Sequence, residues 1–342
     1  MKIIGGSRGS FAAAVTAVAA ALKGVDMVVN GNCVNAFCAT RPPGHHAGRD
    51  LHPMNAVSNG FCILNAAASA ALYAASPRSQ GGLGLKRVCV IDIDVHHGNG
   101  TQDILCSTYD PRFLYISTHA GGAHVNGFQN EDDADADHTI FRRGSLNSND
   151  GIFPGKCGDV SPHPGVLNIP LGTKVTPSDL GTAIVTRVTP AVETFDPDLI
   201  IVSAGFDAHV NDPLGMGGLS AQDYGTVTSV ICQMALRCCS GRVLSVLEGG
   251  YGVPCCKRID DDLFLPKGEG QSAQKILDLG DDLPQNMEDI IDPLLRTKLD
   301  KCHQEGFLQC VQSHVSNLNL YNNTEGNKNV NSDNKNVNSE TQ

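Results

Sequence analysis

Two acidic residues and a histidine follow two separate apolar runs of the chain. Asp94 and His96 stand two residues apart after the run 88–91, and Asp207 follows the run 199–204. Side chains two residues apart on an extended chain point to the same side, which suits a pair of metal ligands. Three protein ligands with one open position are the pattern of a catalytic zinc site. Taken alone, the Asp-Val-His segment is more typical of an ordinary polar strand end.

Four ionisable side chains are crowded around this point of the sequence. Asp92, Asp94, His96 and His97 come directly after apolar residues. Burying such groups costs free energy unless they are paired or bind a metal ion. The crowding therefore favours a metal site over a plain strand end.

A pair of histidines lies in a turn rich in proline and glycine. His45 and His46 are flanked by Pro43-Gly44 on one side and Ala47-Gly48 on the other. A lone histidine is usually a core or surface group, but two adjacent ones in a rigid turn suit proton transfer. The ordinary pKa of histidine, about 6.5, makes it a good general acid and base near neutral pH. The sequence therefore predicts acid–base chemistry at this turn.

Tyr251 follows the segment Glu248-Gly249-Gly250, where glycines allow the backbone to approach a ligand closely. In that position its hydroxyl is able to donate a hydrogen bond to an oxyanion that develops during a reaction. An aromatic residue at the rim of a pocket is a fair alternative interpretation of the same residue.

Apolar runs alternate with helical stretches, a pattern typical of an α/β fold with a mainly parallel sheet and helices on both faces. The predicted strands are 87–94, 113–118, 199–204 and 242–247, and the predicted helices are 65–75, 177–195, 222–239 and 307–318. Several strands are apolar on both faces, as buried parallel strands are. Ligands of open α/β sheets bind at the carboxyl ends of strands, so four distant segments are expected to form one site there.

The apolar stretch 11–22 near the start of the chain allows two interpretations. Basic residues precede it, as in a signal peptide or transit sequence. We favour a helix that Ser10 caps and that ends at Lys23-Gly24, because its many alanines would let it lie close to a sheet.

The composition narrows the class of protein. The 342 residues include 41% apolar ones, enough for a sizeable core, and the net charge of −11 argues against a nucleic-acid surface. No uninterrupted apolar run is long enough to predict a membrane span. The 13 cysteines are odd in number and scattered through apolar runs, which indicates buried thiols in the reducing cytosol or nucleus.

Seven sequence blocks, in order, resemble the zinc-dependent histone deacetylases, most closely the class II branch. The blocks are RPPGHHAG (41–48), NGFCILN (59–65), DIDVHHGNGTQ (92–102), LYIST (114–118), FPG (153–155), FDPDLIIVSAGFDAHVNDPLG (195–215) and LEGGYG (247–252). The resemblance implies an arginase-like α/β fold and hydrolysis of the acetyl amide of acetyl-lysine.

The resemblance also assigns roles to individual residues. It implies that zinc binds Asp94, His96 and Asp207, that His46 transfers the proton, and that His45 assists it electrostatically. A further set of residues would support the reaction or hold the substrate: Asp92 orients His45, Asn99 lies behind His46, Tyr251 polarises the carbonyl, Phe61 and Phe153 wall the acyl-lysine tunnel, and Gly249 and Gly250 form its floor. A structural K⁺ ion near Asp92, Asp94, His96 and Ser117 is a weaker implication.

The partners implied are acetylated lysines of histone tails or other proteins, together with corepressor proteins, in the nucleus, the cytoplasm or both. Neither direct nucleic-acid binding nor a membrane is expected. Two alternatives stay open: a deacetylase of acetylated polyamines or other small amides, and a truncated, inactive zinc-binding scaffold.

The resemblance also suggests how the chain is organised. Residues 1–318 are expected to form the deacetylase domain, with core motifs at 41–252 and a loop excursion at 257–284, and residues 319–342 a disordered polar tail. Family members carry a longer segment before the block that begins at Arg41. The chain is therefore expected to be shortened at this end, with an exposed sheet edge.

Overall fold

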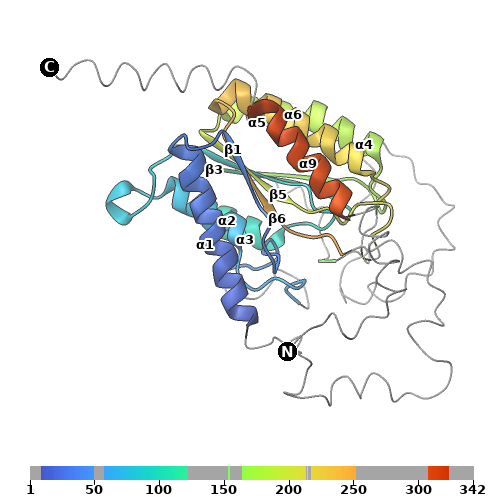
Figure 1. Cartoon of the computed structure of the whole chain (residues 1–342), viewed down its shortest axis with the longest axis horizontal. Helices are drawn as coiled ribbons and strands as arrows, with labels where there is room; N and C mark the ends of the chain where they lie inside the picture. Colours follow the sequence, from blue (N-terminus) through green and yellow to red (C-terminus); the bar gives the residue numbers. More distant parts are fainter. Residues whose placement is uncertain are drawn as a thin grey trace, which may run out of the picture.

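Six parallel strands form one sheet in the order β1-β6-β5-β2-β3-β4 (Figure 1). The structure, a computed structural model, describes residues 9–49, 58–121, 153–154, 164–212, 214, 217–251 and 307–322. The strands are β1 (Asn35–Cys38), β2 (Val88–Asp92), β3 (Phe113–His119), β4 (Val166–Pro170), β5 (Leu199–Ala204) and β6 (Val243–Leu247). The helices are α1 (Ser10–Val29), α2 (Ala66–Ala75), η1 (Arg78–Gln80), α3 (Asn99–Cys106), α4 (Pro177–Ala183), η3 (Ile184–Val188), α5 (Thr189–Phe195), α6 (Ala221–Cys239) and α9 (Phe307–Asn322).

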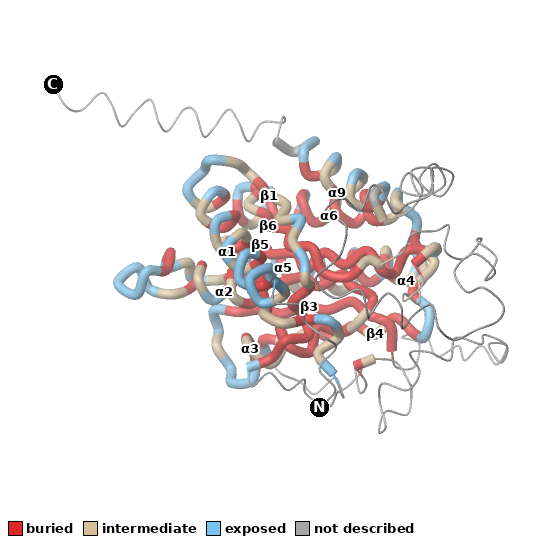
Figure 2. Tube along the Cα trace, turned by 60° about the horizontal axis from the view of Figure 1, so that its bottom comes forward, coloured by how far each residue is buried: buried red, intermediate tan, exposed pale blue. Residues whose placement is uncertain are grey.

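Helices cover both faces of the sheet, which confirms the predicted fold class. One core cluster joins α1, α2 and α3 to Val88, Val90 and Leu244, and the other joins α4, α5, α6 and α9 to Cys89 and Ile91. Successive residues of a strand therefore face opposite layers, as the period of two requires. Figure 2 shows the burial concentrated in the central strands.

The site lies where the winding of the sheet reverses. From β2 the chain proceeds outward through β3 and β4, and from β5 it proceeds through β6 in the opposite direction. The helix that follows β2 packs on one face and the helix that follows β5 packs on the other. The chain therefore diverges beyond the carboxyl ends of β2 and β5, and this point is where open α/β sheets bind ligands.

Helix α1 is confirmed, although it differs from the prediction at both ends. It begins at Ser10 without a side-chain cap and continues past Gly24 to Val29. Gly24 lies against the sheet, where an added Cβ would come within 2.6 Å of Leu244. Among the described helices, α1 alone is long and apolar enough to cross a membrane, with a mean hydropathy of 1.7. Its buried alanines and Gly24 pack on the sheet, whereas Phe11, Val15 and Met27 of the same helix are exposed.

The stretch 177–195 is helical but not one α-helix. It consists of α4, a π-helical turn η3 and α5. Pro190 lies in the first turn of α5 and has no N–H to donate, and Thr189 Oγ1 donates to the carbonyl of Ile184 at 2.9 Å. Helical periodicity in the sequence does not reveal this change of hydrogen-bond pattern.

Two strands were not predicted, and both lie at the sheet edges. β1 has only four residues, and β4 contains Asn168 and ends at Pro170, so neither shows a long apolar run. The predicted strand 87–94 ends earlier, at Asp92. Helix α9 continues to Asn322, four residues past its predicted end at residue 318. The loop at 257–284 and the rest of the tail lie outside the described residues.

Gly100, in α3, tests how tightly the layers are packed around the histidine turn. A Cβ at Gly100 would overlap the backbone of His46 and Ala47, whereas a Cβ at Gly181 in α4 would meet nothing within 4 Å. We expect Gly100→Ala to lower the free energy of unfolding by about 1–3 kcal/mol, because backbone cannot move aside. The matched change Gly181→Ala should raise it by about 0.5–1 kcal/mol. Denaturant unfolding of both variants checks this, and equal effects would contradict it.

Candidate metal centre and histidine pair

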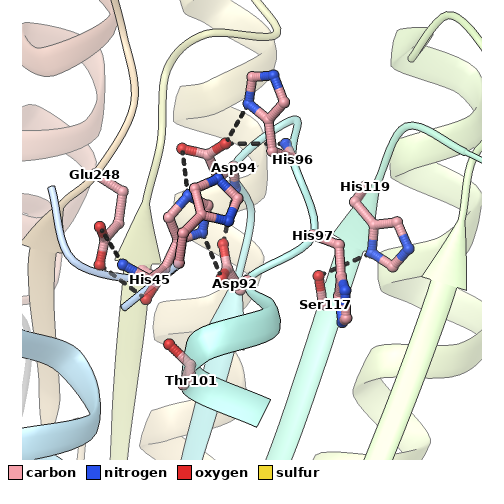
Figure 3. Close-up of polar contacts among 12 residues, drawn as sticks. His45, Asp92, Asp94, His96, His97, Thr101, Ser117, His119 and Glu248 are labelled. Atoms are coloured by element: carbon pink, nitrogen blue, oxygen red, sulfur yellow. Dashed lines mark hydrogen bonds and ion pairs between the residues drawn. The ribbon is translucent and has the colours of Figure 1, made fainter. Parts of the chain in front are cut away.

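The side chains of Asp94, His96 and Asp207 converge beyond the carboxyl ends of the central strands β2 and β5, where each offers one ligand atom within 4.8 Å of the others. His96 Nδ1 lies 3.1 Å from Asp94 Oδ1 and 3.0 Å from Asp207 Oδ2. Both carboxylates are fully buried, and only the imidazole is partly exposed. Figure 3 shows Asp94 and His96 side by side above the strand ends.

Backbone amides hold the two carboxylates in place. Val95 N donates to Asp207 Oδ1 at 3.0 Å, and Gly249 N donates to Asp94 Oδ2 at 2.8 Å. Asp94 and His96 lie beyond the end of β2, so a turn brings them together rather than the extended strand that their spacing predicted. The prediction that the two side chains lie together is confirmed, but the extended strand that it assumed is wrong, because β2 ends at Asp92.

The electrostatics of this cluster suit a divalent cation. Burial raises the pKa of Asp207 to about 6, and the charge of Asp94 adds to the rise. Burial would also raise the pKa of Asp94, but the charge of His45 and hydrogen bonds from His96 outweigh it and lower that pKa. Two carboxylates and one imidazole are a donor set that zinc accepts, and a dication would offset the cost of two buried charges.

The two histidines of the Pro-Gly turn have different partners. His45 Nδ1 lies 3.0 Å from Asp92 Oδ2, and His46 Nδ1 lies 2.8 Å from Asn99 Oδ1. Their ring centroids are 4.0 Å apart, and the His46 ring lies 6.0 Å from the ring of His96. The predicted pairings of Asp92 with His45 and Asn99 with His46 are therefore present.

The surroundings drive the pKa values of the two histidines apart. Burial lowers the pKa of His46 well below its ordinary value, and the charges of His45 and His96 lower it further. Burial also acts to lower the pKa of His45, but Asp94 and Asp92 outweigh it and raise that pKa. These opposite shifts favour a neutral His46 and a protonated His45, a separation that gives one site both a base and a positive charge.

The aromatic residues expected to wall a tunnel border this cluster. The Phe153 ring lies 4.8 Å from the ring of His46 and 6.2 Å from that of His96. The Phe61 ring lies 5.5 Å from that of Tyr251, and Phe61 is 42% exposed, as an entrance residue would be. Both phenylalanines therefore lie at the site, Phe153 beside the histidines and Phe61 beside the tyrosine.

The backbone of Tyr251 is anchored, because its N–H donates to Asp212 Oδ2 at 2.7 Å. Burial, assisted by the charges of Asp207 and Asp94, raises the pKa of the Tyr251 hydroxyl, so it stays protonated and able to donate.

The two glycines before Tyr251 lie against different parts of the chain. A Cβ at Gly249 would overlap Asp207 Oδ2 and Asp94 Oδ2, so this glycine lets the backbone reach the carboxylates. Gly250 has a φ of +126°, and a Cβ added there would come within 2.6 Å of the ring of Phe307. The substrate contact expected of them stays a prediction.

Sequence reasoning did not assign roles to three residues that the structure places here. Glu248 is fully buried, and its carboxylate accepts hydrogen bonds from Gly44 N and His45 N. Arg41 donates to the carbonyl of Glu248, and the Tyr115 hydroxyl lies 3.2 Å from Asp92 Oδ2. A carboxylate directly after the apolar run 243–247 was the available signal for Glu248, because a buried charge needs partners.

The potassium ion suggested by the resemblance gains no support from these contacts. Ser117 Oγ lies 2.8 Å from His119 Nδ1, and Asp92 Oδ2 is paired with His45. A potassium site therefore remains a prediction from the resemblance.

Comparisons with known proteins agree on one family. A family model described as Histone deacetylase domain matches residues 4–264. The chain is 37% identical over 247 residues to Type-2 histone deacetylase 2 of Dictyostelium discoideum, an alignment that covers 72% of this chain and 13% of that protein. It is 33% identical over 245 residues to a probable deacetylase of Archaeoglobus fulgidus, covering 72% and 58%. The chain thus spans only part of the length of these relatives.

A solved structure titled as the crystal structure of the HDA15 HD domain has a similar fold. Its TM-score to this chain is 0.52 with 29% sequence identity, and the alignment covers 89% of this chain and 72% of that one.

The buried carboxyl of Glu248 predicts a pH dependence of stability. Burial raises its pKa from 4.5 to about 7, although His45 opposes the rise. Between these values the folded chain keeps a proton that the unfolded chain releases, so stability falls as pH rises. Glu248→Gln has no proton to release at this position. Between pH 4 and 8 the free energy of unfolding of wild type should therefore fall by about 3 kcal/mol relative to that of this variant.

Denaturant unfolding of wild type and Glu248→Gln at several pH values measures this difference. A difference that stays constant across the range would show that Glu248 keeps an ordinary pKa in the folded state.

Proposed function

Because the chain belongs to the histone deacetylase family, we propose that it catalyses zinc-dependent hydrolysis of the acetyl amide of N-acetyl-lysine in histones or other proteins. The products are acetate and the free lysine amine. The observation that carries the proposal is the convergence of Asp94, His96 and Asp207 beside a neutral imidazole, His46. A family of hydrolases supplies the reaction class, and this geometry supplies the residues.

In this proposal the side chains of Asp94, His96 and Asp207 would hold the zinc ion, since three protein ligands are the pattern of a catalytic zinc site. When bound there, zinc polarises the acetyl carbonyl and lowers the pKa of a water molecule. The backbone N–H groups of Val95 and Gly249 keep the two carboxylates oriented toward the ion, as outer contacts do at metal sites.

His46 acts as the base and then as the acid. With Asn99 Oδ1 as acceptor, its Nδ1 carries the proton and its Nε2 is free to take one from water. The lowered pKa keeps His46 neutral before the reaction, and it then passes the proton to the leaving amine. His45, held cationic by Asp92 and Asp94, stabilises negative charge without transferring a proton.

Tyr251 donates its hydroxyl to the oxygen of the tetrahedral intermediate. Phe61 and Phe153 hold the four methylenes of the lysine stem between apolar walls and exclude charged head groups. Gly249 keeps the backbone close to the carboxylates of Asp94 and Asp207, and Tyr251 lies two residues further along this backbone.

The substrate class is inferred from charge and family. A net charge of −11 favours cationic, lysine-rich substrates such as histone tails, in the nucleus or the cytoplasm. Corepressor partners and membership of class II extend the proposal, and the Type-2 naming of one relative supports the latter.

The direct test measures zinc content together with deacetylation of an acetyl-lysine peptide and of acetylated spermidine. We expect one zinc ion per chain and faster turnover of the peptide. Faster turnover of acetylated spermidine would favour the small-amide alternative. A chain that binds zinc and deacetylates neither would be the inactive scaffold.

Asp207→Ala tests the ligand set. Removing one of three ligands should abolish zinc retention, because the remaining two groups cannot hold the ion at a buried site. Elemental analysis after dialysis measures the zinc, and Asp110→Ala, a turn carboxylate paired with Arg112, is the matched control. A fully metallated Asp207→Ala chain would remove Asp207 from the site.

Tyr251→Phe tests the oxyanion donor. We expect turnover to fall by about 10²–10³ while zinc stays bound, as after loss of one oxyanion donor in other hydrolases. Tyr109→Phe, at an exposed residue, should leave turnover unchanged. Equal turnover in wild type and Tyr251→Phe would exclude the tyrosine from the mechanism.

A further inference from the structure

Two segments that lie more than 200 residues apart in the sequence exchange hydrogen bonds beneath the site. Glu248, after β6, accepts from Gly44 N at 2.6 Å and from His45 N at 3.1 Å. In return, Arg41 Nη1 donates to the main-chain carbonyl of Glu248 at 2.6 Å. Each segment thus uses a side chain to hold the backbone of the other, and Figure 3 shows Glu248 beside His45.

The segments joined in this way carry the two groups that must meet the substrate. The turn of Gly44 and His45 continues directly into His46, and the turn of Glu248 continues through two glycines to Tyr251. The guanidinium of Arg41 also lies 5.1 Å from the centre of the Tyr251 ring, where a cation is attracted to the aromatic face. Arg41 therefore contacts both the main chain at Glu248 and the ring of Tyr251.

Other hydrogen bonds and close backbone contacts also hold the histidine turn, in addition to those with Glu248. The carbonyl of His45 accepts from Thr101 N, and that of Ala47 accepts from the amide of Asn65. A Cβ at Gly44 would come within 2.6 Å of the Leu64 carbonyl oxygen, so the backbone has no free space there. Without Glu248, the N–H groups of Gly44 and His45 would be buried without these partners, which is costly.

A second metal site is the competing interpretation, because His45, Cys62 and Glu248 also offer ligand atoms within 4.8 Å. Existing contacts argue against it. Both oxygens of Glu248 are engaged, one with the two backbone N–H groups and the other with Ser203 Oγ at 3.3 Å. Cys62 Sγ already accepts from His46 N at 3.4 Å, and His45 Nδ1 is paired with Asp92 Oδ2 at 3.0 Å.

We propose that Arg41 and Glu248 are a reciprocal pair of positioning residues, which sets the separation of His46 and Tyr251 required for deacetylation. This inference rests on the proposed function. Neither side chain touches the reacting atoms, and both act through the backbone of the other segment. Loosening the pair should misplace the base and the oxyanion donor relative to each other, and displacements of about 1 Å cost on the order of 100-fold in rate.

The kinetic test compares Arg41→Ala, Arg41→Lys and Glu248→Ala in the zinc-loaded chain. Arg41→Ala and Glu248→Ala, which removes the oxygen that accepts from Gly44 N and His45 N, should lower kcat for an acetyl-lysine peptide by about 10- to 100-fold, with KM changed by about threefold or less. Arg41→Lys should recover part of the loss, because lysine keeps one donor and the cation. Arg87→Ala, which removes an exposed arginine paired with Asp196, should match wild type.

Two measurements separate positioning from a general loss of structure. Zinc content and the melting temperature of each variant establish that the chain is folded and loaded. Amide hydrogen exchange should then rise at Gly44 and His45 in Glu248→Ala, and in the 248–251 segment in Arg41→Ala. The double variant should be about as slow as the slower single one, because both changes release the same connection.

The outcomes distinguish this inference from the proposed function. Suppose that wild type deacetylates the peptide, and that the variants are folded and zinc-loaded but have the same kcat or the same amide hydrogen exchange as wild type. The positioning role is then wrong, and the proposed function stands. Additive losses in the double variant would likewise show that the two residues do not act as a pair. If zinc-loaded wild type is inactive on every peptide, the proposed function fails and the positioning role fails with it.

Discussion

The structure depends on the burial of carboxylates at the carboxyl ends of the central strands. Asp92, Asp94, Asp207 and Glu248 are each fully buried there. Such charges are tolerated only when cations and hydrogen-bond donors surround them. Imidazoles, backbone N–H groups and the hydroxyls of Tyr115 and Ser203 provide these contacts, and together they form the site. The same cost of burial that brings these partners together also leaves a cluster suited to a divalent cation.

Close backbone approach makes this concentration of charge possible. Gly249 admits its own chain to the side of Asp94 and Asp207, and Gly100 brings α3 against the histidine turn. A side chain at either position would separate groups that must be within hydrogen-bond distance. Small residues play the same part in α1, where Gly24 and the buried alanines bring the helix onto the sheet. In both the sheet layers and the site, glycines and alanines therefore let backbone segments approach one another closely.

Adjacent residues of one type acquire different properties from their surroundings. His45 and His46 differ in charge because one faces carboxylates and the other faces an amide and further imidazoles. Their separation into a fixed cation and a neutral base follows from Asp92 and Asn99, which lie on different elements. The reciprocal pair of Arg41 and Glu248 then connects this turn to the tyrosine on the far side of the cluster. Acid–base roles and spacing are thus properties of the assembly of segments.

The sequence alone predicted the fold class, the central strands and most of the residues that converge at the candidate site, although it gave no role to Arg41, Tyr115 or Glu248. Long apolar runs ending in Asp, His and Gly are local signals, and buried parallel strands produce them wherever a site lies at their ends. The edge strands β1 and β4 were missed because short or polar strands carry no such signal, and the π-helical turn η3 follows from Pro190 and Thr189 rather than from periodicity. Only the tertiary structure decided the sheet order, the opposite shifts in the pKa values of the two histidines and the contacts of Gly249, Arg41 and Glu248. Each of these depends on distances between segments far apart in the chain, and such distances are set by packing that residue types and spacing do not encode locally.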